Sequence, residues 1–497
     1  MKLSRREAIK LGLIGSGSLL LPLGYQSPAW AQFSPQIQPF QLPFRTPPVL
    51  KPVRSDETTD YYEITMQKAR VEILPGLSTE IWGYNGITPG PTIKQPRGRL
   101  SVVRFINKLD EAMSIHLHGM ASLPQYDGYA EDLIRPDYYK DYFYPNNRAS
   151  TLWYHDHAVH KTSRHVYMGL AGMYIVEDEF ERDLPLPKGD YEIPLIIQDK
   201  KFAKDGSLIF DDLGQKGVYG DVMLVNGVPW PRMEVANRKY RFRVLNAGAS
   251  RTANLRLSTG DDLIVIGTDA GLISAPVKTK NLRIGIAERY GFIIDFSKYP
   301  IGTRVVLQNP ISFSNVDRDT RTNQIMCFDV VRQESDDSSI PSVLRPVQPI
   351  PVSSAVRTRT FRFDRNGGQW KINNKTWDKN RIDANPGFNE VEIWNLVNTG
   401  GSWVHPVHIH LVDLQLLDRN GRPPLPYERG WKDVFFLGEG ETVRVITRFG
   451  PNSGKYMMHC HNIVHEDHDM MNQFEVGQGG PDPLSDPAKP ISGMLPL

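Results

Sequence analysis

Histidine is the first chemical signal in this 497-residue chain, because all thirteen copies lie in two blocks. None occurs between Val166 and Val404. Alternate side chains of a β-strand share a face, so an H-x-H pair directs two imidazoles at one point. Neutral imidazole is a favoured ligand of copper, zinc and iron. Eight of the histidines form four such pairs, at 116/118, 155/157, 408/410 and 459/461.

A single H-x-H pair is explained more simply by two surface histidines on a half-exposed strand. Four pairs in a chain with only thirteen histidines fit that explanation poorly. Eight imidazoles are also too many for one ion. We therefore expect a metal cluster that draws ligands from both blocks.

A second signal is the stretch MMHCHNIVHEDHDMM (457–471), which holds one of the two cysteines, four histidines and four methionines. In an extended strand the thiol of Cys460 points away from the imidazoles on either side of it. His405 is an odd number of residues from His408 and His410, so it lies on the face of Cys460. One strand can therefore serve metals on both of its faces.

Two more side chains complete a ligand set on the Cys460 face, since His465 and Met470 follow the cysteine within loop distance. Two histidines, one cysteine and a weak thioether are the ligands of blue-copper electron-transfer sites. Cys460 also offers electrons a short covalent path to both neighbouring imidazoles. The sequence predicts a blue-copper site that is joined to the cluster through this cysteine.

The elements that must position these residues are short strands. Period-2 runs rich in Val, Ile, Phe and Tyr alternate with Gly, Pro, Asn and Asp, as in LSVVRFINKL (100–109), KYRFRVLNAG (239–248) and ETVRVITRFG (441–450). Such runs at regular spacing favour β-sandwiches, and helical periodicity is scarce. We predict an all-β chain.

Two pattern-poor stretches, EFERDLPLPKGD (179–190) and the Ser/Pro-rich 335–356, divide the chain into thirds. The length prior of about 150 residues per domain agrees. The first and last thirds also echo each other, because WYHDHAVH (153–160) resembles MHCHNIVH (458–465). The predicted division is a signal peptide at 1–31, a proline-rich arm at 32–55, sandwich domains at 56–180, 190–335 and 357–485, and a linker at 336–356.

The N-terminus reads as an export signal. Met1–Lys10 is basic and carries the pair Arg5–Arg6, an apolar run extends from Leu11 to Leu23, and an A-x-A cleavage pattern ends at Ala31. Twin arginines indicate the Tat type of signal. A membrane anchor is the alternative, but the apolar run is short and rich in Gly and Ser. We expect a periplasmic or secreted bacterial protein that uses the Tat machinery.

The motifs HLHG (116–119), WYHDH (153–157), HPVHIH (405–410) and HCHNIVHEDHDM (459–470) together resemble the multicopper oxidases over essentially the whole mature chain. The resemblance implies three cupredoxin-like Greek-key domains and four coppers per chain. It implies copper-dependent oxidation of small organic donors by dioxygen, with one-electron steps at a type 1 copper and four-electron reduction of dioxygen to water at a trinuclear cluster.

The resemblance assigns each copper ligand by position. The type 1 copper takes His405, Cys460, His465 and Met470, and the type 2 copper takes His116 and His408. In the first-domain repeat Asp156 stands where Cys460 stands in the third, so that domain should lack its own blue copper. The type 3 pair takes His118, His155, His157, His410, His459 and His461.

Within the family the chain is most similar to the bilirubin oxidases and the spore-coat-type laccases. HEDHDMM (465–471) and YDGYAED (126–132) are typical of that branch. Trp403 stands two residues before His405, as in bilirubin oxidases. We expect it to pack over His405 or to border the substrate site, with plain core filling as an equal alternative.

Dioxygen reduction consumes protons, so buried carboxylates should lie near the cluster. By resemblance these are Asp127 and Glu466, although each could instead be an acid of a loop or helix cap. Three other histidines, His160, His165 and His468, match no copper position, and we expect them at the surface or behind the ligands. Of the remaining candidates, Met471 and Cys327 are expected to be apolar packing residues.

Composition limits the other functions. Lys and Arg number 58 against 56 Asp and Glu, which argues against a nucleic-acid partner. A scaffold protein that has lost copper would show broken ligand motifs, a copper carrier would not need a wired cluster, and a cuprous oxidase would carry a methionine-rich insertion. A general laccase acting on phenols remains the close alternative. The sequence does not show the oligomeric state, and a monomer is our default expectation.

Overall fold

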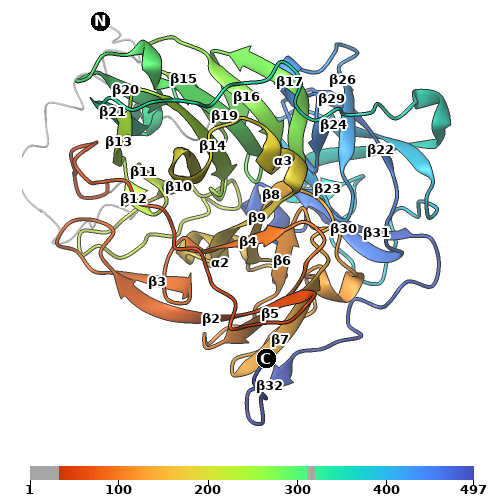
Figure 1. Ribbon diagram of the computed structural model, residues 1–497. Coiled ribbons are helices and arrows are strands. Elements are labelled where there is room, and N and C mark those ends of the chain that lie inside the picture. Colours follow the sequence, from red (N-terminus) through yellow and green to blue (C-terminus); the bar gives the residue numbers. More distant parts are fainter. Residues whose placement is uncertain (1–32, 312, 314–319) are drawn as a thin grey trace, which may run out of the picture. The chain divides into compact units, whose positions relative to one another are not determined.

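Each of three domains is built from two β-sheets, as the alternating pattern of the sequence predicted. The structure is a computed structural model that describes residues 33–311, 313 and 320–497. The predicted signal peptide, residues 1–31, lies outside the described residues. Figure 1 shows the first domain in red to yellow, the second in yellow-green to green, and the third in blue-green to blue.

The first domain combines a six-stranded sheet, in the order β1-β2-β5-β7-β32 with β3 beside β2, and a four-stranded sheet, in the order β4-β9-β8-β6. Buried side chains from both sheets, such as Ile64 and Tyr154, form one core. Its strands in chain order are β1 (Arg54–Ser55), β2 (Thr59–Val71), β3 (Thr79–Tyr84), β4 (Gly90–Pro96), β5 (Leu100–Asn107), β6 (Ile115–His118), β7 (Tyr138–Tyr144), β8 (Ser150–Asp156) and β9 (Ala171–Glu177).

The second domain has a seven-stranded sheet, β12-β11-β10-β14-β19-β16-β17, and a five-stranded sheet, β13-β21-β20-β15-β18. Cys327 is a buried member of the core between them, as predicted. Its strands are β10 (Glu192–Lys200), β11 (Val222–Val225), β12 (Val228–Pro229), β13 (Arg232–Ala236), β14 (Lys239–Asn246), β15 (Ala253–Leu257), β16 (Leu263–Thr268), β17 (Gly271–Thr279), β18 (Leu282–Ile284), β19 (Arg289–Asp295), β20 (Arg304–Gln308) and β21 (Gln324–Arg332).

The third domain has a six-stranded sheet, β23-β22-β24-β29-β26-β27, and a four-stranded sheet, β28-β25-β30-β31. The smaller sheet carries the histidine motifs of this domain on β25 and β30. Its strands are β22 (Ala355–Asn366), β23 (Gln369–Ile372), β24 (Val391–Asn398), β25 (His405–Ile409), β26 (Leu414–Arg419), β27 (Trp431–Lys432), β28 (Val434–Leu437), β29 (Thr442–Arg448), β30 (Gly454–Cys460) and β31 (Met471–Val476).

One topological unit recurs in the three domains. A parallel pair joins β2 to β5, β10 to β14 and β22 to β24, in each case within the larger sheet of its domain. Parallel neighbours need a crossover connection, so the same crossover is repeated three times. This repeat agrees with the internal echo seen in the sequence.

The helices are short, and two of them follow the strands that carry histidine motifs. The side chain of Asp467 in α4 accepts hydrogen bonds from the backbone N–H groups of Thr162 and Ser163 at the start of α2. This carboxylate caps a helix whose own N-cap residue makes no side-chain bond. The helices are α2 (Thr162–Met168), α3 (Glu179–Asp183), α4 (Ile463–Asp467) and the 3₁₀ turns η2 (Pro124–Tyr126), η3 (Gly189–Tyr191), η4 (Phe296–Lys298), η5 (Thr320–Asn323), η6 (Val352–Ser354) and η7 (Pro426–Glu428).

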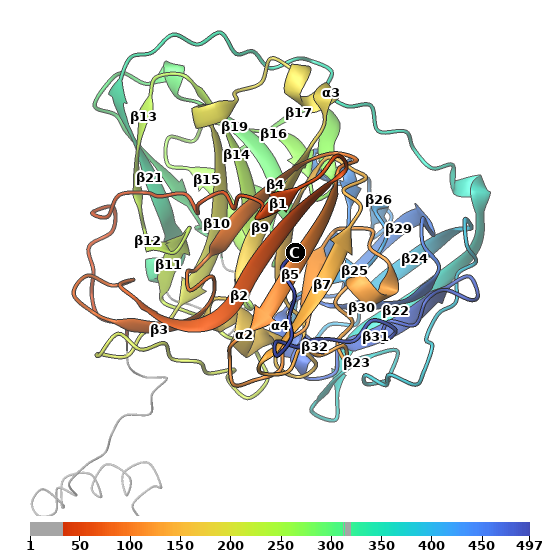
Figure 2. The same cartoon turned by 60° about the horizontal axis from the view of Figure 1, so that its bottom comes forward.

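Residues from all three domains meet in a further buried cluster that includes Trp153, Leu245 and Val434. The C-terminal strand β32 (Lys489–Pro490) leaves the third domain and pairs with β7 of the first. Figure 2 shows the C-terminus over β5 and β7, where Arg104 donates a hydrogen bond to the carbonyl of Leu495. Within the described residues, no helix is both long and apolar enough to cross a membrane.

Candidate metal centres

His405, Cys460 and His465 come together in the third domain, as the sequence predicted. His405 begins β25, Cys460 ends β30, and His465 lies on α4. The Cys460 Sγ is 3.4 Å from the His405 Nδ1 and 3.7 Å from the His465 Nδ1, and these two nitrogens are 3.4 Å apart. All three side chains are buried. Two nitrogens and one sulfur thus converge on a single point.

Met470 is tied to this group through its backbone. Its carbonyl accepts a hydrogen bond from the Cys460 N–H, and its own N–H donates to the His465 carbonyl. The side chain is fully buried in the core of the third domain. These bonds hold the thioether residue beside the predicted ligands.

The eight histidines of the H-x-H pairs converge between the first and third domains. Facing strands bring them together, since His116 is paired with His155 and His408 with His459. The Nε2 atoms of His116 and His408, one from each domain, are 3.3 Å apart. The candidate metal-binding groups are His116, His118 and His408; His118, His155 and His461; and His157, His410 and His459.

Cys460 connects two of these groups. Its neighbours His459 and His461 belong to different triads, one with His157 and the other with His155. The strand parity inferred from the sequence therefore holds in three dimensions. The backbone of a single residue links the thiol to both triads.

The donor set fits copper. Burial is the main cause that lowers the pKa of every histidine in these groups, and it lowers the pKa of His405 and His459 to about 3. The imidazoles are therefore neutral, which is the ligand form. Within the described residues, the His118 Nδ1 and the His155 and His461 Nε2 atoms are buried without hydrogen-bond partners. A bound metal would satisfy them, since buried polar atoms normally have partners.

The thiol of Cys460 has a pKa above its ordinary value because it is buried. The free protein therefore holds a protonated thiol at neutral pH. Metal binding to the sulfur must release that proton.

The two carboxylates expected near the cluster lie directly beside it. The Asp127 Oδ2 is 2.7 Å from the His410 Nδ1, and the backbone carbonyl of Asp127 is 2.5 Å from the His116 Nδ1. The Glu466 Oε2 is 2.9 Å from the His459 Nδ1. Burial raises the pKa of Asp127 well above its usual range and that of Glu466 to about 7. Glu466 can therefore carry a proton near neutral pH.

Comparison with known proteins agrees with this geometry. Three segments, residues 65–181, 213–328 and 349–480, match models of the multicopper oxidase family. The chain is 42% identical over 475 residues to a bilirubin oxidase of Albifimbria verrucaria. This alignment covers 90% of this chain and 82% of that protein. The chain belongs to the multicopper oxidases. Copper is thus its cofactor, and dioxygen is its electron acceptor.

Other members of the family are similar over most of their length. A laccase of Bacillus stratosphericus is 36% identical, with 87% of this chain and 98% of that protein covered. The crystal structure of a laccase from Pediococcus acidilactici superposes with a TM-score of 0.83 at 31% identity, and covers 90% of this chain and 95% of that one. These matches confirm the predicted family and the cupredoxin-like fold of this multicopper oxidase.

Aromatic rings cover the candidate metal group of His405, Cys460 and His465. Trp370 stacks on His465 with ring centroids 3.6 Å apart, and it also lies 5.8 Å from His405. Trp403, which we expected to pack over His405 or border the substrate site, lies edge-on to Trp370 at 5.1 Å and to His465 at 6.0 Å. It is half-buried. The sequence analysis did not single out Trp370, because a tryptophan in a hairpin carries no metal signal.

A cation lies on the outer side of these rings. The guanidinium of Arg365 is 4.8 Å from the Trp370 ring and 5.9 Å from the Trp403 ring. A loop of the second domain also contacts these rings, since the Trp370 indole N–H donates a hydrogen bond to the Gln215 carbonyl. Trp370 is fully buried, so Trp403 and Arg365 are the partly exposed members of this group beside His465.

The three histidines without a copper position differ from each other. His160 is exposed, and His468 lies 3.2 Å from the Asp212 carboxylate at the surface. His165 is fully buried, where its Nδ1 is 2.8 Å from the Asp156 Oδ2. The carboxylate of Asp156, the counterpart of Cys460, is thus paired with the His165 imidazole, and it accepts hydrogen bonds from backbone N–H groups.

Two charged residues near the cluster escaped the sequence analysis. The Asp433 Oδ1 is 2.9 Å from the His118 Nε2, and Arg289 of the second domain forms an ion pair with Asp433. Both are buried. Neither residue stands at a spacing typical of metal ligands in the sequence. The one local hint of them is Gly119 of the HLHG motif, whose missing side chain leaves room for both.

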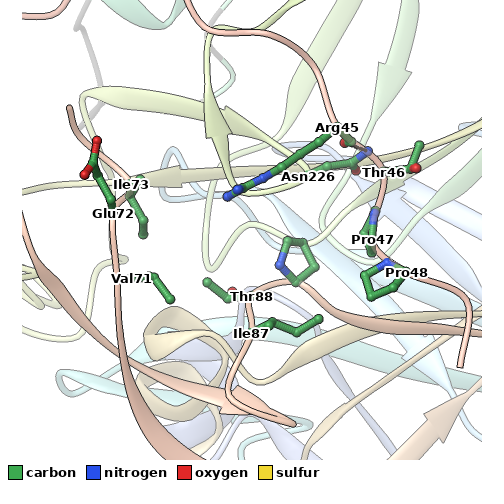
Figure 3. A pocket seen from close by; sticks show the side chains of 11 residues that line it. Arg45, Thr46, Pro47, Pro48, Val71, Glu72, Ile73, Ile87, Thr88 and Asn226 are labelled. Atoms are coloured by element: carbon green, nitrogen blue, oxygen red, sulfur yellow. Dashed lines mark hydrogen bonds between the residues drawn. The ribbon is translucent and has the colours of Figure 1, made fainter.

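The cavity in Figure 3 lies elsewhere in the oxidase. It has a volume of about 400 Å³ and is lined by the proline-rich arm, by Ile73 and Ile87 of the first domain, and by Asn226 of the second. The side chain of Arg45 extends across it. None of the predicted copper ligands lines this cavity.

Proposed function

We propose that four coppers are held by the residues that the motifs single out. His405, Cys460, His465 and Met470 hold the type 1 copper, and His116 with His408 hold the type 2 copper. The type 3 pair is shared by two triads. Copper supplies one-electron chemistry and a site where dioxygen accepts four electrons. The triads are His118 with His155 and His461, and His157 with His410 and His459.

We infer that Asp127 and Glu466 supply protons to the cluster. Each carboxyl oxygen lies beside the outer nitrogen of a proposed ligand, as described above. A group with a pKa near the working pH can give up a proton and regain it from solvent. Glu466, with a pKa of about 7, meets that condition best.

We propose that the donor is a bilirubin-like tetrapyrrole, and that phenols and aromatic amines are poorer substrates. The observation that carries this proposal is the partly exposed pair of Trp403 and Arg365, which lies against the buried Trp370 and His465. A planar conjugated molecule with carboxylates complements an indole ring and a guanidinium. The 42% identity to a bilirubin oxidase supports the same choice.

A general laccase that acts on phenols is the second candidate, favoured by the 36% identity to a laccase. A cuprous oxidase ranks third. Methionines in this chain are dispersed apart from the pairs 457/458 and 470/471, with no rich insertion near His465.

We propose that residues 1–31 are a Tat-type signal, that the protein works in the periplasm or outside the cell, and that it is a monomer. We also propose domain limits of 56–180, 190–335 and 357–485, with an arm at 32–55 and a linker at 336–356. The twin arginines and the A-x-A pattern support the export proposal.

Oxygen uptake by the copper-loaded protein tests the substrate proposal, with bilirubin, a simple phenol and Cu(I) offered in parallel. We expect bilirubin to give the highest kcat/KM. The variant Arg365→Ala should lower kcat/KM for bilirubin more than for an uncharged phenol, because the carboxylates lose their partner. Equal or better rates with phenols would make the protein a laccase, and a preference for Cu(I) would make it a cuprous oxidase.

A further inference from the structure

Arg289 connects the second domain, where we propose no copper, to the proposed trinuclear cluster. It begins β19, is wholly buried, and uses all five of its guanidinium N–H donors. The Nε–H donates to the Thr151 carbonyl of the first domain, and two others donate to the Ala287 and Asp269 carbonyls of its own domain. The remaining two form a fork to the Asp433 carboxylate of the third domain, at 2.7 and 2.5 Å. One side chain thus fixes three domains at a single point.

Asp433, the acceptor of that fork, contacts two histidines of the cluster. Its Oδ1 is 2.9 Å from the His118 Nε2, and its backbone carbonyl is 2.9 Å from the His408 Nδ1. Oxygen atoms of both kinds accept, so each of these two ring nitrogens carries the proton. The other nitrogen of each ring is then a free lone pair. In His118 that atom is Nδ1, which is buried without a partner among the described residues.

The glycine of the HLHG motif makes this contact possible. A Cβ atom at Gly119 would lie 2.8 Å from the Arg289 Nη2 and 2.8 Å from the Asp433 Oδ2. Its φ of +91° also disfavours other residues. The ion pair therefore occupies the space that a side chain next to His118 would need.

We propose that Asp433 and Arg289 are positioning residues that select the metal-facing nitrogens of His118 and His408. This inference rests on the proposed assignment of those histidines as copper ligands. The carboxylate holds His118 with Nδ1 toward the cluster, and the forked guanidinium prevents the carboxylate from turning away. The second domain, where we propose no copper, then helps to position the ligands of the cluster.

The physical basis is the geometry of paired hydrogen bonds. A fork of two parallel N–H···O bonds fixes both the distance and the plane of a carboxylate, which a lysine ammonium cannot do. Partners behind the ligands commonly change metal affinity or activity by about 10–100-fold. Loss of the fork should therefore weaken the cluster while the type 1 site, built from other residues, stays intact.

The variants Arg289→Lys and Asp433→Asn test this proposal in the full-length copper-loaded protein. We expect blue absorption from the type 1 copper to be retained, which also reports correct folding. Copper should be lost from the cluster at chelator concentrations about 10–100-fold lower than in the unmodified protein. The type 2 signal in electron paramagnetic resonance should change in shape or disappear. Oxygen uptake should fall in parallel.

A matched control is Arg243→Lys. Arg243 is also buried and also contacts Thr151, because its Nη1 donates to the Thr151 hydroxyl. It is paired with the carboxylates of Glu192 and Glu181, and it contacts none of the proposed copper ligands in these bonds. It belongs to the same second domain but to strand β14. We expect its copper content and type 2 signal to match those of the unmodified protein.

Unchanged cluster copper and an unchanged type 2 signal in both test variants would overturn the proposal. So would an equal loss in Arg243→Lys, which would mean that any buried ion pair at this junction has the same effect. If Arg289→Lys also loses its blue absorption, the proposal is tested with Gly119→Ala, which displaces the ion pair without removing it. Loss of cluster copper from this variant supports the proposal, and unchanged cluster copper overturns it. Failure of the unmodified protein to bind four coppers would instead refute the ligand assignment.

Discussion

At the scale of single residues, strand parity explains why Cys460 lies between two kinds of candidate metal site. Its thiol faces His405 and His465, while the imidazoles on either side of it join two different triads. This arrangement needs only an extended strand and three consecutive residues. It was therefore predictable from the sequence.

Glu466 gives the first prediction at this scale. Its carboxyl has a pKa of about 7 because it is buried, so it holds a transferable proton below that pH and loses it above. Dioxygen reduction by the fully reduced protein should slow as pH rises through about 7. The variant Glu466→Gln has no such proton at any pH, and we expect a rate roughly 100-fold lower without that pH step.

Stopped-flow reoxidation of the reduced protein measures this rate separately from substrate oxidation. Glu475→Gln, at a half-buried acid of β31, is a suitable control and should keep the original profile. A Glu466→Gln variant that retains both the rate and the pH step would rule out Glu466 as the proton donor.

Met470 gives the second prediction. An axial thioether donates weakly to copper and lowers the potential of a blue site, compared with an apolar residue. Met470→Leu should keep the blue colour and raise the type 1 potential by roughly 60 mV or more, which is a tenfold change in the reduction equilibrium. Redox titration of the blue absorption measures it. An unchanged potential would show that Met470 is not an axial ligand.

Other residues of the site could not be predicted, because their roles depend on distant parts of the chain. Asp433 of the third domain contacts His118 of the first, and Arg289 of the second domain pairs with Asp433. Trp370 covers His465 only after two sheets have packed together. No spacing in the sequence encodes such contacts, whereas H-x-H parity is local.

At the scale of elements, the C-terminal segment shows how domains are held around the cluster. Strand β32 adds to the sheet of the first domain, and Tyr126 donates a hydrogen bond to Asp486 just before it. The sequence analysis ended the third domain at residue 485 and predicted no strand beyond it. Two residues of strand are too short for a periodic signal.

A chain that ends at Asp486 should therefore be less stable. It loses the β32 pairing and the bond from Arg104 to Leu495, and a few hydrogen bonds at about 1 kcal/mol each suggest a loss of roughly 1–3 kcal/mol. Denaturant unfolding, monitored through the blue absorption, measures this loss in the free energy of unfolding. Lys489→Ala, which removes only an exposed side chain, should leave the midpoint unchanged. Equal midpoints for the truncated and full chains would contradict a bracing role.

At the scale of the whole molecule, buried charges lie at the contacts between domains. Lys200, on β10 of the second domain, donates from Nζ to the Tyr167 carbonyl of the first. Burial lowers its pKa from 10.5 to about 7. Below pH 7 the lysine is charged in both folded and unfolded chains, and the full cost of burying the charge is present. Between pH 7 and 10.5 only the unfolded chain keeps the proton, so rising pH favours the folded state.

The variant Lys200→Met removes this titration. We expect the stability of the unmodified protein relative to Lys200→Met to increase from pH 7 to 10.5, by at most roughly 4–5 kcal/mol. Denaturant midpoints of the two proteins across that range measure the difference. A difference that is independent of pH would show that Lys200 keeps its ordinary pKa.

The central claim is that one cysteine joins a type 1 copper to a separate trinuclear cluster. Copper analysis combined with electron paramagnetic resonance of Cys460→Ser tests it most directly, with the unmodified protein beside it. The account predicts three coppers per chain, a retained type 2 signal, no blue absorption and no oxygen uptake. A variant that keeps four coppers and turns over, or one that loses the cluster together with the blue copper while remaining folded, would contradict it.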